Sequence, residues 1–577
     1  MNYLTIGSPI LATLAAAATW LLAGHQRGAV AHVAPSITVR IDTTIRLTTF
    51  DPKRDWGAAL DGHDADDLPR IYTPKNIAAM RSAGFGPVTY RLRTELGIET
   101  WHWNPAGHWS DAAHHRGYWI SDAQAPRPIT VSFGYRLPRR GRTIDDANND
   151  GYSRIDDGDT TTFWKTNPYL DPRFTGDPES MHPQWFTIDL RHAQPVDAAR
   201  IIWGNPYPFD YTVDYWDGDQ TQPIDYNPDG RWRHFPHGTI TESRGGSAEL
   251  ALGDTPVTTR FIRVVMSRSS HTASGGDPRD SAGFALREVY FGARDARGML
   301  HDGVQHDTLP TTQSAVIVSS TDPWHRASDI DSSTAQPGID AVMKTGLTNH
   351  RPVYFPTGLL FDTPENAAAE VRFLRSRRYP ISGIELGEEP DGQRITPEDY
   401  GALYVRFAAA LRRVAPAVRL GGPSYQNLID DPLDIWPDPA APARHPTPVG
   451  RFLEYLQAHH RVADYQFLSF EWYPFDDVCD DPADNLAAAP GMLADALSQL
   501  RKTGLADSIP RVITEYGYSA HLSTAEVTMP AALFDADLLG NFFSHGGSQA
   551  FYFGYEPGDI SHEPSCEHWG NLIMLLA

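Results

Sequence analysis

Strand and helix signals alternate from about residue 350 to the end of this chain, and this alternation limits the possible folds more than any other feature. Short apolar runs of strand length are separated by longer stretches in which apolar residues recur at helical spacing. The alternation predicts a parallel sheet covered by helices. Six strands are predicted in this part of the chain, at residues 352–359, 381–389, 418–422, 465–473, 511–516 and 550–555.

Two more strands are predicted upstream, at residues 56–60 and 88–92, on either side of a helix signal at 74–83. The eight strands together predict an α/β fold, a (β/α)8 or TIM barrel, whose chemistry lies at the carboxyl ends of the strands. Further helices are predicted at 364–378, 397–414, 448–459, 484–504 and 524–545. A threonine N-cap followed by a proline marks four helix starts, at Thr73, Thr363, Thr396 and Thr447.

The alternating rhythm stops near residue 125 and resumes near residue 310. Between these points, short strand signals with aromatic residues are separated by turns rich in Asp, Gly and Pro, a pattern typical of an all-β sandwich. We therefore expect a barrel in two parts, residues 40–125 and 310–577, with a sandwich at 126–300 inserted between its second and third strands. Such an insertion is physically easy where the termini of a sandwich lie close together.

Two predicted barrel strands end in glutamate. Glu389 ends the run Ile381-Ser-Gly-Ile-Glu-Leu-Gly-Glu-Glu-Pro390, and Glu515 lies in Pro510-Arg-Val-Ile-Thr-Glu-Tyr-Gly-Tyr518. Carboxylates at the ends of the fourth and seventh strands can face each other across a sugar, where one protonates the leaving oxygen and the other attacks the anomeric carbon. A glycosidase is the leading hypothesis, and a barrel in which these acids are ordinary loop residues is the alternative.

The two motifs and their order resemble clan A glycoside hydrolases, the 4/7 superfamily, and are most similar to family 39. The resemblance covers roughly residues 50–125 and 310–577, where Gly421-Gly-Pro-Ser424 is also similar to the fifth strand of these enzymes. It implies that Glu389 is the acid/base, that Glu515 is the nucleophile, and that a strand-six tyrosine hydrogen-bonds the nucleophile. That tyrosine is Tyr473, in Phe470-Glu-Trp-Tyr-Pro474. The predicted substrate-binding residues are Glu388, Glu471, Trp472, Tyr473 and Tyr555.

The sequence departs from the pattern of the family at two positions. Glu388 stands where the family has an asparagine before the acid/base, and Glu471 stands where the sixth strand usually has a histidine. That asparagine normally contacts the 2-hydroxyl of the sugar, and a carboxylate there could accept the hydroxyl proton. The negative charge of Glu388 would raise the pKa of a neighbouring carboxyl, which suits Glu389 as an acid. The sugar, its linkage and the choice of endo or exo cleavage stay open.

The predicted sandwich carries a second resemblance, in four segments at 157–164, 184–190, 261–265 and 284–290. In this order they resemble the discoidin, or coagulation factor 5/8 type C, fold, which many carbohydrate-binding modules of family 32 share. The resemblance spans roughly residues 128–293. It implies an all-β discoidin-like sandwich that binds a glycan, and a structural module without a ligand is the alternative.

A calcium-binding loop is predicted at residues 146–157. The segment Asp146-Ala-Asn-Asn-Asp-Gly-Tyr-Ser-Arg-Ile-Asp-Asp157 matches the spacing at which side-chain oxygens surround calcium. The expected ligands are Asp146, Asn148, Asp150 and Asp157. We therefore expect structural Ca²⁺ and no cofactor for catalysis, and a loop of Asx-turns without metal is the alternative.

The composition and the N-terminus predict an exported protein with a carbohydrate partner. A net charge of −23 excludes nucleic acid from the expected partners, because phosphates would be repelled. Residues 1–31 have the apolar stretch and small-residue cleavage site of a signal peptide, or form an uncleaved anchor. We expect a secreted, periplasmic or cell-surface protein that contacts a membrane only if this segment is retained. The two cysteines, Cys479 and Cys566, could form a disulfide after export or stay as thiols.

The sequence thus predicts a retaining O-glycosyl hydrolase that acts on an extracellular or periplasmic glycan. Two alternatives use the same features. One is a non-catalytic glycan-binding or adhesion protein with a degenerate barrel, and the other is a transglycosylase that uses the same two glutamates. The sequence stops where an eighth helix is expected, so truncation within that helix is a further expectation.

Overall fold

The structure is a computed structural model of the 577-residue chain. It describes residues 42, 44–60, 63–64, 68–90, 99–138, 152–226, 228–273, 275–429, 447–475, 477–562 and 569–570. The chain divides into two compact units, Met1–Leu47 and Thr48–Ala577, and the elements below belong to the second. The predicted signal peptide or anchor at 1–31 lies outside the described residues. Among those that are described, no helix is long and apolar enough to cross a membrane.

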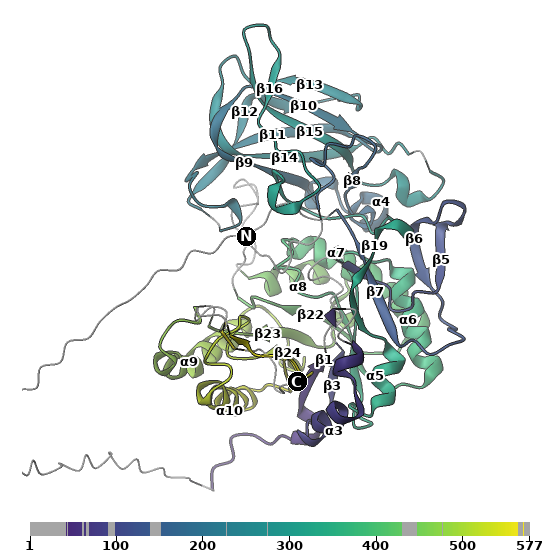
Figure 1. Cartoon of the computed structure of the whole chain (residues 1–577), viewed down its shortest axis with the longest axis vertical. Helices are drawn as coiled ribbons and strands as arrows, with labels where there is room; N and C mark the ends of the chain where they lie inside the picture. The colour runs from purple at the N-terminus through teal and green to yellow at the C-terminus, as the bar shows by residue number, and fades with distance from the viewer. Residues whose placement is uncertain are drawn as a thin grey trace, which may run out of the picture. The chain divides into compact units, whose positions relative to one another are not determined.

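Eight parallel strands form a closed barrel, which confirms the fold class predicted from the sequence (Figure 1). All eight strands predicted from the apolar runs are present. Because they follow one another around the ring in chain order, their carboxyl ends meet at one end of the barrel. In chain order they are β1 (Trp56–Leu60), β3 (Val88–Tyr90), β20 (Val353–Thr357), β21 (Ile381–Leu386), β22 (Leu420–Tyr425), β23 (Leu468–Trp472), β24 (Arg511–Tyr516) and β25 (Gln549–Tyr552).

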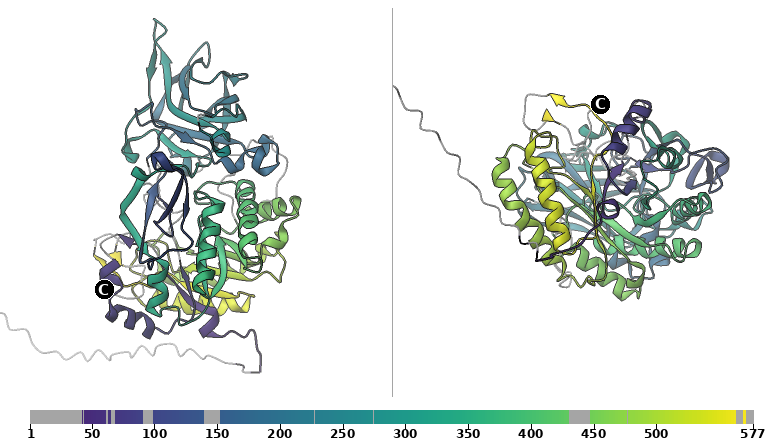
Figure 2. Two further views of the ribbon diagram at one scale, coloured as in Figure 1. Left: turned by 90° about the vertical axis from the view of Figure 1, so that its right-hand side faces the viewer. Right: turned by 90° about the horizontal axis from the view of Figure 1, so that it is seen from below.

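Helices surround the barrel strands, as the view from below shows (Figure 2). The longer ones are α3 (Pro74–Ser82), α5 (Ile339–Thr345), α6 (Pro364–Arg377), α7 (Pro397–Val414), α8 (Pro448–Ala458), α9 (Pro482–Leu500) and α10 (Met529–Ser544). The four predicted N-caps are confirmed, since each threonine hydroxyl accepts a hydrogen bond from a backbone N–H in the first turn of its helix. They are Thr73, Thr363, Thr396 and Thr447. The short helices are α1 (Pro52–Asp55), α2 (Leu68–Ile71) and α4 (Pro172–Thr175).

One layer of the barrel interior alternates large side chains with glycines. The side chains of Tyr354, Phe467, Val512 and Phe551 form a buried cluster there. Gly383 has no Cβ to obstruct them, since one would lie 2.7 Å from the ring of Phe467 and 3.0 Å from that of Tyr354. Large and small residues on neighbouring strands therefore fill the barrel as a packed core.

Two antiparallel sheets form the predicted sandwich. The first has the order β13 (Ser247–Ala251), β10 (Ala198–Trp203), β15 (Ala285–Arg294) and β16 (Leu300–Asp302), with β8 (Trp164–Lys165) also pairing with β15. The second has the order β12 (Gly230–Ile240), β11 (Pro208–Gly218), β14 (Val257–Ser269), β9 (Gln184–Val196) and β17 (Ala315–Val318). Inward-facing side chains such as Phe186, Val264 and Leu286 make one core between the sheets.

The limits of the sandwich differ from the expected 126–300. The strand β17 pairs with β9, so the second sheet extends to Val318. At the other end, β7 (Val131–Arg136) belongs to a different sheet, in which it pairs with β4 (Glu99–Trp101) and β19 (Ile330–Pro337), and β19 also pairs with β2 (His63–Asp64). A third sheet joins β5 (Gly107–Asp111), β6 (Arg116–Ser121) and β18 (His325–Arg326), and β26 (Ser561–His562) pairs with β27 (Trp569–Gly570). These pairings join segments far apart in the chain, which local periodicity does not reveal.

Candidate active site

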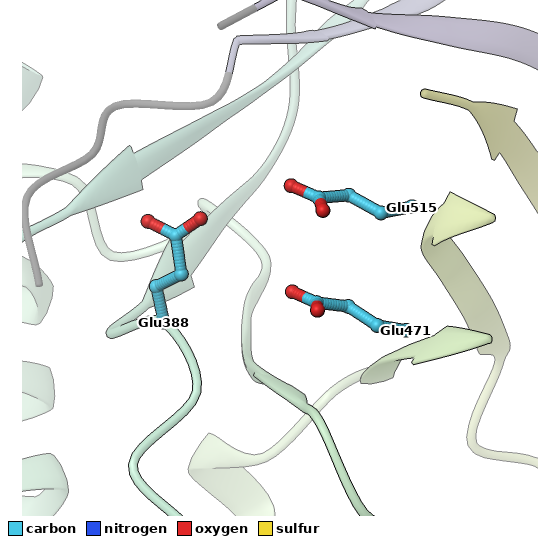
Figure 3. Close-up of side chains that lie close together, drawn as sticks. All are labelled: Glu388, Glu471 and Glu515. Carbon is cyan, nitrogen blue, oxygen red and sulfur yellow. The ribbon is translucent and has the colours of Figure 1, made fainter. Parts of the chain in front are cut away.

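Three glutamates meet at the carboxyl ends of three barrel strands (Figure 3). They are Glu388, after β21, Glu471, in β23, and Glu515, in β24. Each offers a carboxylate oxygen within 4.8 Å of the others, and all three side chains are buried, with 2%, 4% and 6% of the residue exposed. Glu471 and Glu515 are paired in register on adjacent parallel strands, which puts both side chains on the same face of the sheet. Such a group could act on a sugar or hold a cation with hard oxygen ligands.

Hydrogen bonds orient the carboxylates of Glu515 and Glu471. The Tyr473 hydroxyl donates to Oε2 of Glu515 at 3.2 Å, which is the contact expected from the sequence. The hydroxyl of Ser424 donates to Oε1 of Glu471 at 3.0 Å and lies 2.7 Å from the hydroxyl of Thr514. A hydrogen bond to a carboxylate favours its ionised form. The site therefore presents Glu515 with a donor that stabilises it as an anion.

The backbone around Glu389 is held in an unusual conformation. Glu389 has φ of 44°, and Ser424, across the loop, has φ of 58°. This left-handed region costs a residue with a side chain about 1–2 kcal/mol. The N–H of Glu389 donates to the carbonyls of Pro423 and Ser424, both at 3.2 Å, and these bonds hold the conformation. Strain of this kind gathers at functional sites.

The side chain of Glu389 lies beside a buried acidic group. Gly392 and Gln426 are close to this side chain. A Cβ added to Gly392 would lie 3.3 Å from Oε2 of Glu389 and 2.9 Å from Oε1 of Gln426. Asp391, two residues along the chain, accepts hydrogen bonds from the backbone N–H of Asn427 at 2.6 Å and of Gln426 at 3.2 Å. Burial raises the pKa of Asp391 to about 7, and the negative charge of Glu389 adds to the rise. Burial and the neighbouring charge therefore both favour the protonated form of Asp391.

The aromatic residues predicted to bind substrate take different positions. Trp472 ends β23, is half-buried, and has an indole N–H with no hydrogen-bond partner among the described residues. Tyr555 is fully buried, donates its hydroxyl to the carbonyl of Met80, and packs edge-on against Phe85 with ring centroids 5.4 Å apart. Tyr555 thus packs α3 against the barrel, which corrects the expectation of a substrate contact.

Sequence reasoning missed three residues at this site. Phe553, just after β25, packs edge-on against Tyr473 with ring centroids 6.4 Å apart. Ser424 and Thr514 join the hydrogen bonds around Glu471. The one available signal was for Ser424, which follows a Gly-Gly-Pro run. Phe553 and Thr514 resemble ordinary apolar and strand residues in the sequence.

The predicted calcium loop is described only at its last residue. Asp146, Asn148 and Asp150 lie outside the described residues. Asp157 accepts hydrogen bonds from the N–H of Asp159 at 2.9 Å and from the Thr162 hydroxyl at 2.8 Å, and burial raises its pKa. Calcium binding at this loop stays a prediction.

We expect calcium to raise the melting temperature of the chain, because an ion that binds only the folded state stabilises it. The gain is about 2.7 kcal/mol when free calcium exceeds Kd a hundredfold. Calorimetry with calcium, and with a chelator, measures the effect. Magnesium at equal ionic strength is the control, and Asp150→Ala should remove the calcium shift alone. Equal melting with calcium and with chelator would contradict the prediction.

Cys479 is disulfide-bonded. The only other cysteine in the sequence is Cys566, which lies outside the described residues. Of the two states that the sequence left open, the structure has the disulfide at Cys479.

No family model and no curated protein matches the sequence. Several solved structures are similar to parts of it. One is chitosan-binding module 1 of a chitosanase/glucanase from Paenibacillus sp. IK-5, with 23% identity over 24% of this chain and 83% of that chain and a TM-score of 0.18. Another is a family 44 xyloglucanase from Paenibacillus polymyxa with xyloglucan, with 12% identity, coverage of 39% and 61%, and a TM-score of 0.32.

A third is Cel44A, a family 44 endoglucanase from Clostridium thermocellum, with 14% identity, coverage of 37% and 60%, and a TM-score of 0.30. This chain therefore spans about 60% of each of the two family 44 structures. The barrel is identified by its strand pairing and not by these similarities. The likeness to family 39 and to the discoidin fold stays a prediction.

Proposed function

We propose that this protein is a retaining glycoside hydrolase that acts on a carbohydrate at the carboxyl end of its barrel. One observation carries the proposal: the buried carboxylates of Glu388, Glu471 and Glu515 converge within 4.8 Å, and a tyrosine donates to the last of them. Retaining glycosidases need one carboxylate as nucleophile and a second carboxyl as acid/base, about 5–5.5 Å apart. In chain order Glu389 follows the fourth barrel strand, β21, and Glu515 lies in the seventh, β24, and the proposal assigns them these two roles.

In the first step of the proposed reaction, Glu515 attacks the anomeric carbon while the bond from that carbon to the leaving oxygen breaks. Glu389 gives its proton to the leaving oxygen, so the aglycone departs neutral and a glycosyl-enzyme ester remains. In the second step, Glu389 takes a proton from water as the water oxygen attacks the same carbon and releases Glu515. Two inversions give net retention. Tyr473 keeps Glu515 ionised between turnovers through its hydrogen bond.

Glu388 and Glu471 define the class of sugar in this proposal. Both lie within 4.8 Å of Glu515, where Glu388 can accept a hydrogen bond from the sugar 2-hydroxyl. Three carboxylates this close repel one another and would repel a fourth negative charge. The group therefore favours a neutral or cationic sugar ring over an acidic or sulfated one.

The proposal extends to the sandwich and to the place of action. We propose that the sandwich is a discoidin-like module that binds the same glycan, and that the protein acts outside the cytoplasm. The disulfide at Cys479 supports export, because structural disulfides persist in oxidising compartments. A signal peptide at residues 1–31 would provide the route.

Hydrolysis of a panel of aryl glycosides and neutral polysaccharides tests the proposed activity. Release of aglycone with an NMR time course that shows retained configuration at the anomeric carbon is the expected result. Binding without release would identify a glycan-binding protein with an inactive barrel. Longer sugar products in place of hydrolysis would identify a transglycosylase. An inverted first product would exclude the double-displacement mechanism.

Tyr473→Phe is expected to lower kcat/KM by about ten- to a hundredfold, since a hydrogen bond to a charged group contributes roughly 1.5–3 kcal/mol. Without that donor the ionised form of Glu515 is less favoured, so its pKa rises and the acidic limb of the pH–rate profile moves to higher pH. Tyr207→Phe, in the sandwich, is the matched control and should leave the profile unchanged. An acidic limb that does not move in Tyr473→Phe would exclude this role.

A further inference from the structure

A cavity of about 580 Å³ lies at the amino ends of the barrel strands, opposite the glutamates. Its lining residues precede or begin strands: Arg351 comes two residues before β20, Arg419 one before β22, and Ser548 one before β25. Arg54, Ser382 and Gln549 also line it. The volume falls in the range of small-molecule sites, which is roughly 300–1,000 Å³.

The buried cluster in the barrel interior separates this cavity from the candidate active site. Tyr354, Phe467, Val512 and Phe551 fill the barrel interior near its amino end, and each is at most 1% exposed. Glu388, Glu471 and Glu515 lie at the other end of the strands. The cavity is therefore a second site, which the proposed hydrolysis does not use.

The lining carries an excess of positive charge. Arg54 pairs with Asp55 through two hydrogen bonds of 2.7 and 2.8 Å, and Asp55 also accepts the N–H of Asp51 at 2.9 Å. Asp55 is thus committed to Arg54. Within the described part of the chain, neither Arg351 nor Arg419 forms an ion pair with a carboxylate. Two uncompensated guanidinium groups stand out in a chain with a net charge of −23.

A buried hydroxyl organises the polar side of the cavity. The hydroxyl of Tyr354 donates to Oε1 of Gln549 at 2.7 Å. Gln549 in turn donates to the carbonyl of Arg54 at 2.9 Å. These bonds hold the polar groups in fixed positions before any ligand arrives, which lowers the entropy that binding costs.

An aromatic pair forms the apolar side. Phe50 and Phe543 both line the cavity and stack with ring centroids 4.5 Å apart and an interplanar angle of 8°. A ligand that fills the whole volume would thus meet guanidinium groups on one side and aromatic carbon on the other.

We propose that this cavity binds a small organic anion. A phosphate or carboxylate group would be held by Arg351 and Arg419, because guanidinium groups recognise these planar or tetrahedral anions with paired hydrogen bonds. The carbon part of the ligand would lie against Phe50 and Phe543. Inorganic phosphate alone would leave most of the cavity unfilled, which favours an anion that carries a ring or a chain of carbon atoms.

Titration calorimetry of the full chain tests the proposal, with phenyl phosphate, benzoate and inorganic phosphate as probes. Phenol and sodium chloride at matched ionic strength are the controls. Phenyl phosphate or benzoate should bind and raise the melting temperature, and inorganic phosphate should bind at least about tenfold more weakly. Arg351→Gln and Arg419→Gln should each weaken binding by about ten- to a hundredfold, as expected for a lost charge-assisted hydrogen bond.

Arg297→Gln is the matched control, since Arg297 is exposed in the sandwich. It should bind the probes like the unaltered chain. Arg351 is half-buried and forms no ion pair among the described residues, so Arg351→Gln is the variant that best keeps the fold, which circular dichroism checks. Absence of binding by both organic anions, or equal weakening in Arg297→Gln and Arg351→Gln, would overturn the proposal. If inorganic phosphate bound as tightly as the organic anions, the inference that the ligand carries a carbon part would be overturned.

Discussion

Glu515→Ala is expected to abolish turnover, with kcat lower by about 10⁴-fold or more, the scale on which loss of a catalytic nucleophile acts. The reason is that no glycosyl-enzyme ester can form without this carboxylate. Steady-state rates on the best aryl glycoside measure the effect. Glu454→Ala, which removes an exposed glutamate of α8, is the matched control and should keep full activity.

The small anion azide separates a lost nucleophile from a lost fold. In Glu515→Ala, azide can enter the space of the missing carboxylate and attack the anomeric carbon once, so the expected product is a glycosyl azide of inverted configuration. Recovery of the rate by azide with that product would identify Glu515 as the nucleophile. Full activity of Glu515→Ala without azide would refute the proposed mechanism.

Glu389→Ala is expected to show a strong dependence on the leaving group. General acid catalysis contributes about 10²–10⁴-fold, so glycosides with poor leaving groups should lose this factor. Dinitrophenyl glycosides need no proton and should keep most of their rate in the first step. Azide should then accelerate release of the glycosyl-enzyme and give a product of retained configuration, because the ester on Glu515 still forms.

The pH–rate profile supplies a second measurement on the same variant. The acid must be protonated at the start of the reaction, so the rate of the unaltered enzyme falls as the pH rises through the pKa of the acid. Glu389→Ala should lose this alkaline limb and keep the acidic limb that belongs to the nucleophile.

Glu388→Ala is the comparison that decides between two neighbouring carboxyls. The proposal gives Glu388 contact with the 2-hydroxyl, so this variant should lose the same factor with good and with poor leaving groups. The unaltered enzyme should prefer substrates with a 2-hydroxyl over 2-deoxy substrates, and Glu388→Ala should lose this preference. If the leaving-group dependence and the retained azide product appear in Glu388→Ala instead, the two roles are exchanged, because Glu388 is the one within 4.8 Å of Glu515.

Local patterns were enough to predict the barrel. The apolar runs and the Thr-Pro starts identified each of the eight strands and the helices between them except α5, because strand and helix periodicity are properties of neighbouring residues. The hydrogen bond from Tyr473 to Glu515 was expected only from the resemblance to clan A glycoside hydrolases. The limits of the sandwich were not predicted correctly, because β17 pairs with β9 across more than a hundred residues of sequence.

The sequence by itself determined the closed parallel barrel, the inserted β region and the end of the barrel at which the glutamates lie. Only the tertiary structure decided which side chains meet there. Glu388 and Glu389 are adjacent in the sequence but have different neighbours, since Glu388 lies beside Glu515 and Glu389 lies beside Asp391. The backbone of Glu389 has a left-handed φ at this point. Burial made Tyr555 a packing residue, and loops between strands brought Arg351 and Arg419 to one cavity. The physical reason is that periodicity is encoded locally, whereas backbone strain, burial and contacts between loops depend on segments that only the folded chain brings together.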